Sequence, residues 1–186
     1  MSGARGPSPA RAGGAADLRR LIRDIPDFPR RGILFRDITP LLLDPGAFAE
    51  CVRRMAERAP RPEAVVAIES RGFIFGTALA LHWAVPLVPA RKFGKLPAAT
   101  VREVYSLEYG EDTIEIHRDA LAAGQRVAVV DDLLATGGTA AAVSRLTEQL
   151  GARVESVVFL IELKGLGGRE KLAPRRVEAL LEFPAA

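Results

Sequence analysis

The sequence predicts one α/β domain in which a mainly parallel sheet carries helices on both faces. Four short segments are almost wholly apolar, as strands buried on both faces of a parallel sheet are, and helical patterns lie between several of them. These segments are residues 64–68, 86–90, 127–130 and 154–161. The chain has 186 residues, of which 48% are hydrophobic and 26% charged. That length and composition suit a single globular domain.

The domain is predicted to span residues 17–186, after a disordered extension. Residues 1–16 are rich in Gly, Ala, Pro and Arg and show no apolar periodicity, which favours disorder. Asp17 is then predicted to cap a short helix that ends at Pro26, because an aspartate satisfies free backbone N–H groups and a proline disfavours helix before it.

The segments between the apolar strands are predicted to be mostly helical. Residues 28–43 show no clear period and are predicted to be irregular. Pro45 can begin a helix that runs to about residue 59, because proline suits the first helical position. Two further helices are predicted at 72–82 and 139–150, and Gly151 is a suitable C-terminal cap for the second.

Residues 94–121 have a different, more polar pattern. Apolar and polar residues alternate in 105–109 and again in 113–117, with a turn sequence between them. This pattern predicts an antiparallel hairpin that leaves the main sheet. A long excursion beside a ligand crevice is also a candidate lid.

Polar or charged residues follow each of the four apolar strands. Parallel sheets bind ligands in the crevice beyond the carboxyl ends of their strands, so these residues are the first candidates for a site. They are Glu69, Ser70, Arg71, Gly72, Arg91, Lys92, Asp131, Asp132 and Glu162. No role is predicted for Glu162.

Residues 127–139 carry the strongest chemical signal. Asp131 and Asp132 follow the apolar strand, and the glycines at 137 and 138 permit positive φ and convergent N–H groups. Thr139 is predicted to cap the next helix, whose N-terminus suits a phosphate. We expect the turn to hold a phosphate and the two acids to bind the hydroxyls of an attached ribose. The alternative is a purely structural strand-turn-helix. Neither common nucleotide fingerprint, Walker A or Gly-x-Gly-x-x-Gly after a strand, is present.

This motif resembles the phosphoribosyl pyrophosphate signature of the type I phosphoribosyltransferases, and other blocks narrow the resemblance to the adenine phosphoribosyltransferase family. The blocks are FPRRGILFRDI at 28–38, SRGFIFG at 70–76, RKFGKLP at 91–97, YSLEYG at 105–110 and GREKL at 168–172. They stand in the family's order over roughly residues 25–181. The resemblance implies a single-domain type I fold with an N-terminal hood at 26–43 and a hairpin lid at 94–121.

The resemblance also implies an activity. The enzyme would transfer the 5-phosphoribosyl group of phosphoribosyl pyrophosphate to adenine, giving AMP and pyrophosphate in purine salvage. Mg²⁺ is the implied cofactor, held mainly by substrate oxygens and water. A homodimer is implied as well.

Residue roles follow from the same resemblance. Ala135, Thr136, Gly137, Gly138 and Thr139 would bind the 5′-phosphate, and Asp131 and Asp132 the ribose. Ser70, Arg71, Arg91, Lys92 and Lys95 would bind pyrophosphate, with a cis peptide bond at Glu69–Ser70. Leu34, Phe35 and Arg36 would bind adenine, and Glu108 and Arg71 would be catalytic.

Each role has a plainer alternative. Arg71 could be a structural salt-bridge partner, and Arg91, Lys92 and Lys95 could be a solvated charge run. Phe35 could be a core residue and Glu108 an exposed strand residue. The family usually has a basic residue or proline where this chain has Phe93, which weakens a charge-based role for that position.

Composition excludes or disfavours other classes. A run of about 18 apolar residues and an apolar signal segment are both missing from the sequence, and the one cysteine, Cys51, suits a small core residue. These features favour a cytoplasmic protein without membrane partners. The net charge of +3 is mild, and no nucleic-acid partner is expected. The rival hypotheses are an enzyme for hypoxanthine, xanthine or orotate, a nucleic-acid-binding regulator with this fold, and a non-catalytic binding module.

Overall fold

The computed structural model describes residues 15–106 and 110–185. The disorder predicted for residues 1–16 therefore lies outside the described residues, apart from the last two, which open helix α1 (Ala15–Arg20). The described chain forms two compact units, divided between Cys51 and Val52.

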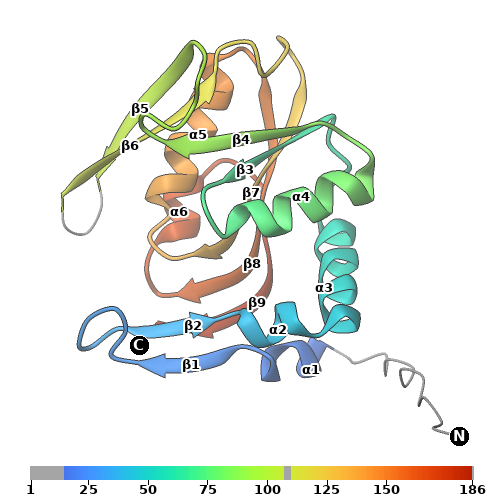
Figure 1. The fold of residues 1–186 in the computed structure, drawn as a ribbon, viewed down its shortest axis with the longest axis vertical. Coiled ribbons are helices and arrows are strands. Elements are labelled where there is room, and N and C mark those ends of the chain that lie inside the picture. Colours follow the sequence, from blue (N-terminus) through green and yellow to red (C-terminus); the bar gives the residue numbers. More distant parts are fainter. Residues whose placement is uncertain (1–14, 107–109, 186) are drawn as a thin grey trace, which may run out of the picture. The chain divides into compact units, whose positions relative to one another are not determined.

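The N-terminal unit contains a small antiparallel sheet and the segment predicted as a hood (Figure 1). Strands β1 (Arg23–Pro26) and β2 (Leu34–Asp37) pair so that Arg23 lies opposite Asp37. The Arg23 guanidinium Nη2 lies 2.6 Å from Asp37 Oδ2, and the Gly32 N–H closes the turn by donating to Asp27 Oδ1 at 2.7 Å. Helix α2 (Thr39–Leu43) follows, and α3 (Pro45–Arg58) begins in this unit.

Two predictions for this unit were wrong. Helix α1 ends at Arg20 rather than at Pro26, and it begins at Ala15, so Asp17 is not its N-cap. Residues 28–43 are not irregular, because they contain β2 and α2. The helix predicted from Pro45 is confirmed as α3.

The second unit is built on a seven-stranded sheet in the order β5-β6-β4-β3-β7-β8-β9. Strands β4, β3, β7, β8 and β9 are parallel to one another, and β6 and β5 pair antiparallel at one edge. The hairpin predicted within the lid is confirmed, but it extends the main sheet instead of leaving it. The strands are β3 (Ala64–Ile68), β4 (Leu87–Lys92), β5 (Thr100–Ser106), β6 (Glu111–His117), β7 (Arg126–Leu134), β8 (Arg153–Lys164) and β9 (Val177–Pro184).

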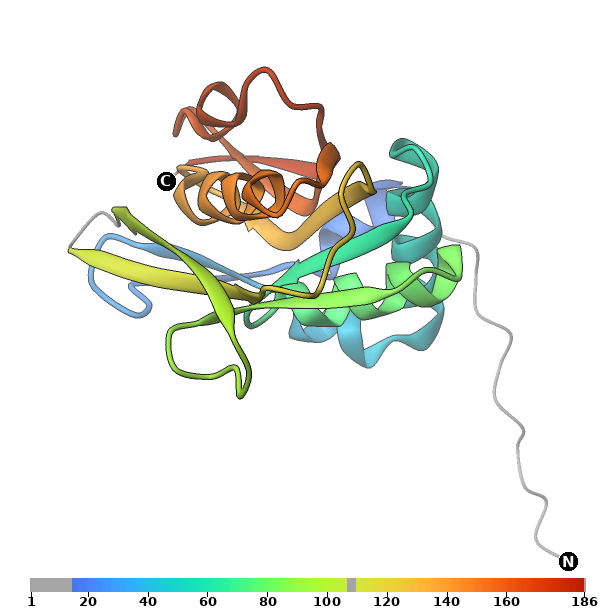
Figure 2. The ribbon, with the colours of Figure 1, turned by 90° about the horizontal axis from the view of Figure 1, so that it is seen from above.

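Helices cover both faces of this sheet, as predicted. Figure 2 shows α4 (Gly72–Trp83) and α5 (Gly138–Gln149) on opposite faces. The alternation of strand side chains explains the arrangement. Gly76 of α4 lies against Ala67 of β3, while the neighbouring Val66 belongs to the core cluster that contains much of α5. The five residues of β3 are all buried, as the apolar pattern indicated.

The C-terminal elements complete the sheet. The short helix α6 (Gly168–Leu172) joins β8 to β9, and neither α6 nor β9 was predicted. All five parallel strands end at the same edge of the sheet, so the residues after them converge there. In the described part of the chain, none of the helices is both long and apolar enough to cross a membrane.

Candidate active site

The two acids of the 127–139 motif lie at the end of β7. Asp131 and Asp132 are still within the strand, which runs further than predicted, to Leu134. Asp132 is only 4% exposed, and Asp131 Oδ1 accepts a hydrogen bond from the Asp132 N–H at 2.8 Å. Burial and the adjacent Asp132 charge raise the pKa of Asp131 well above its usual value, and burial raises the pKa of Asp132 against the opposing effect of Arg71. The pair therefore favours a ligand that donates hydrogen bonds or carries positive charge.

The small-residue turn after β7 leads directly into α5. Gly137 is the N-cap with φ of 76°, a conformation that glycine adopts without strain. Helix α5 starts at Gly138 and has no side-chain cap, so the prediction that Thr139 caps the helix was wrong. A Cβ on Gly137 would lie 2.7 Å from the Gly168 carbonyl oxygen. The turn thus presents an uncapped helix N-terminus, which suits a phosphate, and it is packed against the start of α6.

Arg71 approaches the acids from the beginning of α4. Its Nη2 lies 2.9 Å from Asp132 Oδ2, so the salt bridge that the sequence left as an alternative is present. A third of the Arg71 side chain is nevertheless exposed at this edge, and it can face a ligand as well. The preceding Glu69–Ser70 peptide bond is cis, as the family resemblance implied.

Residues of the predicted cation cluster contact Glu69, an acid to which the sequence assigned no role. Glu69 Oε1 lies 2.6 Å from Lys95 Nζ, and Glu69 Oε2 lies 3.4 Å from Arg91 Nε. Glu69 Oε2 also accepts a hydrogen bond from the Lys92 N–H at 2.9 Å. Burial alone would raise the pKa of Glu69, but these donors outweigh it and lower the pKa. The structure therefore brings Arg91 and Lys95 together beside the cis bond and holds them on one carboxylate.

Lys92 points to a different partner. Its Nζ lies 3.0 Å from Asp112 Oδ2 of strand β6, and Tyr105 of β5 donates to the same oxygen at 3.4 Å. The hydrogen bond to Asp112 raises the pKa of Lys92, and Lys92 in turn lowers the pKa of Asp112. Tyr105 is buried, which raises its pKa. This contact ties one predicted pyrophosphate ligand to the turn end of the hairpin.

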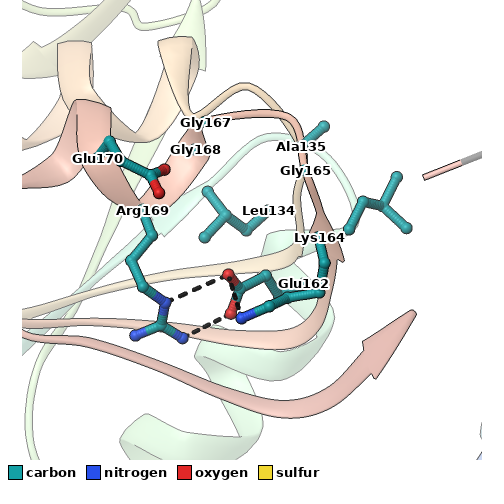
Figure 3. A pocket seen from close by; sticks show the side chains of 10 residues that line it. Leu134, Ala135, Glu162, Lys164, Gly165, Gly167, Gly168, Arg169 and Glu170 are labelled. Atoms are coloured by element: carbon teal, nitrogen blue, oxygen red, sulfur yellow. Dashed lines mark hydrogen bonds and ion pairs between the residues drawn. The ribbon is translucent and has the colours of Figure 1, made fainter. Parts of the chain in front are cut away.

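A hollow of about 280 Å³ lies beside the turn, between the ends of β7 and β8 and the start of α6 (Figure 3). Glu162 is nearly fully buried. Its Oε2 lies 2.5 Å from Arg169 Nη2, and its Oε1 lies 3.4 Å from Lys164 Nζ. Arg169 Nη1 donates to the Val177 carbonyl at 2.6 Å, which anchors α6 to β9. The hydrogen bond from Arg169 lowers the pKa of Glu162. This ion pair holds α6, whose first residue packs against the 135–139 turn.

The predicted adenine ligands belong to the N-terminal unit. Leu34, Phe35 and Arg36 form consecutive positions of β2. Phe35 makes an edge contact with Phe28, with ring centroids 5.1 Å apart, and Arg36 is buried in an ion pair with Asp24. Glu108, the predicted acid/base residue, lies outside the described residues. The roles of these four residues stay predictions.

Sequence analysis missed three acids that organise this region, for different reasons. Glu69 was noted as following a strand, and its position beside Arg71 was the available signal. Asp112 was assigned to a turn but lies in β6. Glu115 sits between two buried isoleucines, so alternation predicts a solvent-facing side chain, yet it is buried. Only the pairing of β6 with both neighbouring strands reveals that position.

Phe93 makes a contact that its sequence context did not predict. The Arg102 guanidinium lies over the Phe93 ring, 5.5 Å from its centroid. Phe93 is exposed, and a cation–π contact at such a site contributes about 0.5–1 kcal/mol. The chain thus has a cation beside Phe93, supplied by β5.

Comparison with known proteins places this arrangement in a family. The phosphoribosyl transferase domain model matches residues 42–177. An adenine phosphoribosyltransferase of Carboxydothermus hydrogenoformans is 53% identical over 169 residues, covering 90% of this chain and 99% of that protein. The crystal structure of the adenine phosphoribosyltransferase from Thermoanaerobacter pseudethanolicus has a TM-score of 0.89 at 47% identity, covering 91% of this chain and all of that one. The Saccharomyces cerevisiae enzyme, complexed with an imino-altritol bisphosphate and adenine, has a TM-score of 0.85 at 42% identity and covers 90% and 98%. The chain therefore belongs to the adenine phosphoribosyltransferase family.

Proposed function

We propose that this protein transfers the 5-phosphoribosyl group of phosphoribosyl pyrophosphate to adenine, giving AMP and pyrophosphate. The observation that carries the proposal is the end of β7, where the half-buried Asp131 and the buried Asp132 precede an uncapped helix N-terminus and Arg71 lies 2.9 Å from Asp132. Such a site matches a ribose between two phosphate groups. The adenine specificity is supported by the names of the relatives and by the adenine in the yeast structure.

The residue roles are part of the proposal. Residues 135–139 bind the 5′-phosphate through backbone N–H groups, and Asp131 and Asp132 accept hydrogen bonds from the ribose hydroxyls. Ser70 and Arg71, with Arg91, Lys92 and Lys95, bind the pyrophosphate. The last three lie against acids, Arg91 and Lys95 on Glu69 and Lys92 on Asp112. On binding, the pyrophosphate oxygens would replace these carboxylates as partners of the cations.

Leu34, Phe35 and Arg36 are proposed to bind adenine. An aromatic face can stack on a purine without selecting it, so backbone groups near Leu34 would read the edge of the base.

The proposed chemistry depends on charge placement. The bond from the ribose C1′ to the pyrophosphate oxygen breaks as the bond to adenine N9 forms, and the electron pair of the broken bond leaves with pyrophosphate. Arg71, Arg91 and Lys95 stabilise the negative charge that develops there, which is the kind of interaction that accelerates a reaction most. Holding both substrates in line lowers the entropic part of the barrier. Glu108 would take or hold a proton of adenine at N9 or N7.

Mg²⁺ is the proposed cofactor, bound mainly to pyrophosphate and ribose oxygens and to water. Among residues 15–106 and 110–185, no group of three or more His, Cys, Asp or Glu side chains could form a metal site by itself. The oxygens of Asp131 and Asp132 are of the hard type that Mg²⁺ prefers, so the site is compatible with a metal that arrives with the substrate. The ion would neutralise charge on the leaving group.

An assay of purified protein with adenine, phosphoribosyl pyrophosphate and Mg²⁺ tests the proposal directly. We expect AMP and pyrophosphate in equal amounts, and little product with hypoxanthine in place of adenine. Absence of AMP from folded protein, or equal turnover of hypoxanthine, would reject the proposed function.

Replacing Glu108 by glutamine is expected to lower kcat about a hundredfold or more, because general acid–base groups contribute about that much. Binding of phosphoribosyl pyrophosphate should stay within about twofold, since the role concerns adenine. Steady-state kinetics and titration calorimetry measure the two quantities. Glu111→Gln is the matched control, because Glu111 is an exposed acid at the start of β6. A Glu108→Gln variant with the kcat of the control would remove the assigned role.

A homodimer is the proposed assembly, with α4 in the interface. Ile74 and Leu81 lie seven residues apart on α4 and are 37% and 77% exposed, so they share one side of the helix. We expect light scattering to give twice the mass of one chain, and Leu81→Glu to shift the protein toward the monomer, since it places a charge in an apolar contact. A wild-type monomer would reject this assembly. A cytoplasmic location is also proposed, supported by the single, buried Cys51.

A further inference from the structure

Glu115 is a buried acid whose position the proposed chemistry does not use. It lies in β6, opposite Arg91 of β4 on one side and Arg102 of β5 on the other. Its side chain is only 3% exposed. Burying a carboxylate costs free energy unless hydrogen bonds or charges compensate it. The groups that donate hydrogen bonds to Glu115 therefore indicate which part of the structure its carboxylate stabilises.

Two of those donors come from the segment that joins β4 to β5, and the third is Thr100, the first residue of β5. Glu115 Oε1 accepts hydrogen bonds from two successive backbone N–H groups, Lys95 and Leu96, each at 3.2 Å. Glu115 Oε2 accepts one from Thr100 Oγ1 at 3.1 Å. Successive N–H groups that point at one anion fix the backbone between them. Glu115 is thus a buried anion whose hydrogen bonds fix the conformation of this turn.

The same turn carries Lys95, one of the proposed pyrophosphate cations, and contacts a second, Arg91 of β4. Lys95 donates through its N–H to Glu115 and through its Nζ to Glu69, while its carbonyl accepts a hydrogen bond from Arg91 Nη1 at 3.2 Å. Glu69 thus holds the cationic side chains, and Glu115 holds the backbone from which one of them projects. Glu115 thus connects the hairpin strand β6 to the turn that carries Lys95.

We infer that Glu115 is a positioning residue for pyrophosphate, which acts by fixing the turn that carries Lys95 and that Arg91 of β4 contacts through the Lys95 carbonyl. This rests on the proposed assignment of those cations to the pyrophosphate group. Glu115 itself touches no substrate in this role. Its loss should weaken binding of phosphoribosyl pyrophosphate and of pyrophosphate while leaving adenine unaffected.

The test compares Glu115→Gln with Glu103→Gln. Glu103 lies in the adjacent strand β5 and pairs with Arg145 of α5 at 2.7 Å, away from the turn. Titration calorimetry with Mg²⁺ and pyrophosphate is expected to show about tenfold weaker binding for Glu115→Gln, because hydrogen bonds to a charged group are lost. The KM for adenine should change less than about twofold. The control should match the wild type in both measurements.

A second background separates this inference from the proposed function. In an Arg91→Met, Lys95→Met double variant we expect pyrophosphate to bind at least about tenfold more weakly, and Glu115→Gln to add less than about twofold, since it acts through the removed cations. If the double variant binds normally, the proposed pyrophosphate assignment fails. If the double variant is impaired but Glu115→Gln is not, the inference about Glu115 fails. Equal losses for adenine and pyrophosphate would also overturn it.

Thr100→Val serves if Glu115→Gln does not fold. It keeps the carboxylate and removes one of its three donors. We expect about threefold weaker pyrophosphate binding with an unchanged KM for adenine. Unchanged pyrophosphate binding in a folded Thr100→Val protein would reject the inference.

Discussion

Replacing Arg71 by alanine is expected to lower kcat/KM for phosphoribosyl pyrophosphate by about a hundred- to a thousandfold. The substitution removes two interactions of the guanidinium at once. It is proposed to stabilise charge on the departing pyrophosphate, and the loss of one such preorganised donor costs about this much. It also lies 2.9 Å from Asp132 Oδ2 and is the cation beside the acidic pair. The KM for adenine should change far less.

The pH profile of this variant gives an independent readout. Arg71 lowers the pKa of Asp132, whereas burial raises it. Removing the cation should raise the pKa of the acidic pair further, so the protonated form persists to higher pH. A protonated carboxyl hydrogen-bonds ribose hydroxyls less well than a carboxylate. The acid side of the kcat/KM profile should therefore move to higher pH in Arg71→Ala.

Two controls accompany the Arg71 variant. Arg71→Lys keeps the positive charge but loses the planar fork of donors, so its profile should stay nearer the wild type while its rate is still reduced. Arg145→Ala removes an exposed arginine of α5 that pairs with Glu103, and should leave kcat/KM unchanged. An Arg71→Ala protein with wild-type kinetics, or one in which the profile moves to lower pH, would contradict the assigned role.

The central sheet could be predicted because its evidence is local. Strand β3 is buried at every position, and a strand buried on both faces is apolar along its whole length. The following helix and the acids of β7 could then be placed from topology, since parallel strands deliver their ends to one edge. The convergence of Arg71 and Asp132 is a consequence of that rule.

The missed features depend on partners that are distant in sequence. Strands β1 and β2 are only four residues long each and are specified by cross-strand pairs such as Arg23 with Asp37. Strand β9 is buried against β8 although its sequence contains Glu178 and Glu182. Glu115 follows the same logic, because its burial is set by two neighbouring strands and a turn. A one-dimensional pattern carries no signal for such contacts.

Replacing Gly168 by alanine is expected to weaken phosphoribosyl pyrophosphate binding about tenfold or more, although this residue is assigned no ligand. A Cβ at this position would lie 2.2 Å from the Ala135 carbonyl oxygen and 2.8 Å from Leu134 Cδ1. Real Cβ atoms do not approach backbone oxygen so closely, so either α6 or the 135–139 turn must move. The ion pair of the buried Glu162 with the half-exposed Arg169 holds α6 in place, so the 135–139 turn is the part expected to move.

The accompanying loss of stability has to be separated from the loss of binding. Overpacking of this kind costs about 1–3 kcal/mol, and a less stable protein can lose activity for that reason alone. Gly124→Ala is the matched control, because Gly124 has φ of 75° and open space around its Cβ position. That substitution should destabilise the fold through backbone conformation, by about 1 kcal/mol, without touching the turn. Denaturant unfolding and calorimetry with phosphoribosyl pyrophosphate measure the two effects in each variant.

The comparison decides which contact shapes the phosphate site. Weaker binding in Gly168→Ala but not in Gly124→Ala would mean that α6 sets the backbone of residues 135–139 through direct contact. Equal binding in the two variants, at similar stability, would mean that the turn tolerates displacement and that α6 is only a connection between β8 and β9. The first outcome is expected, because Gly137 and Gly168 lie against each other from both sides: a Cβ on Gly137 would meet the Gly168 carbonyl oxygen at 2.7 Å.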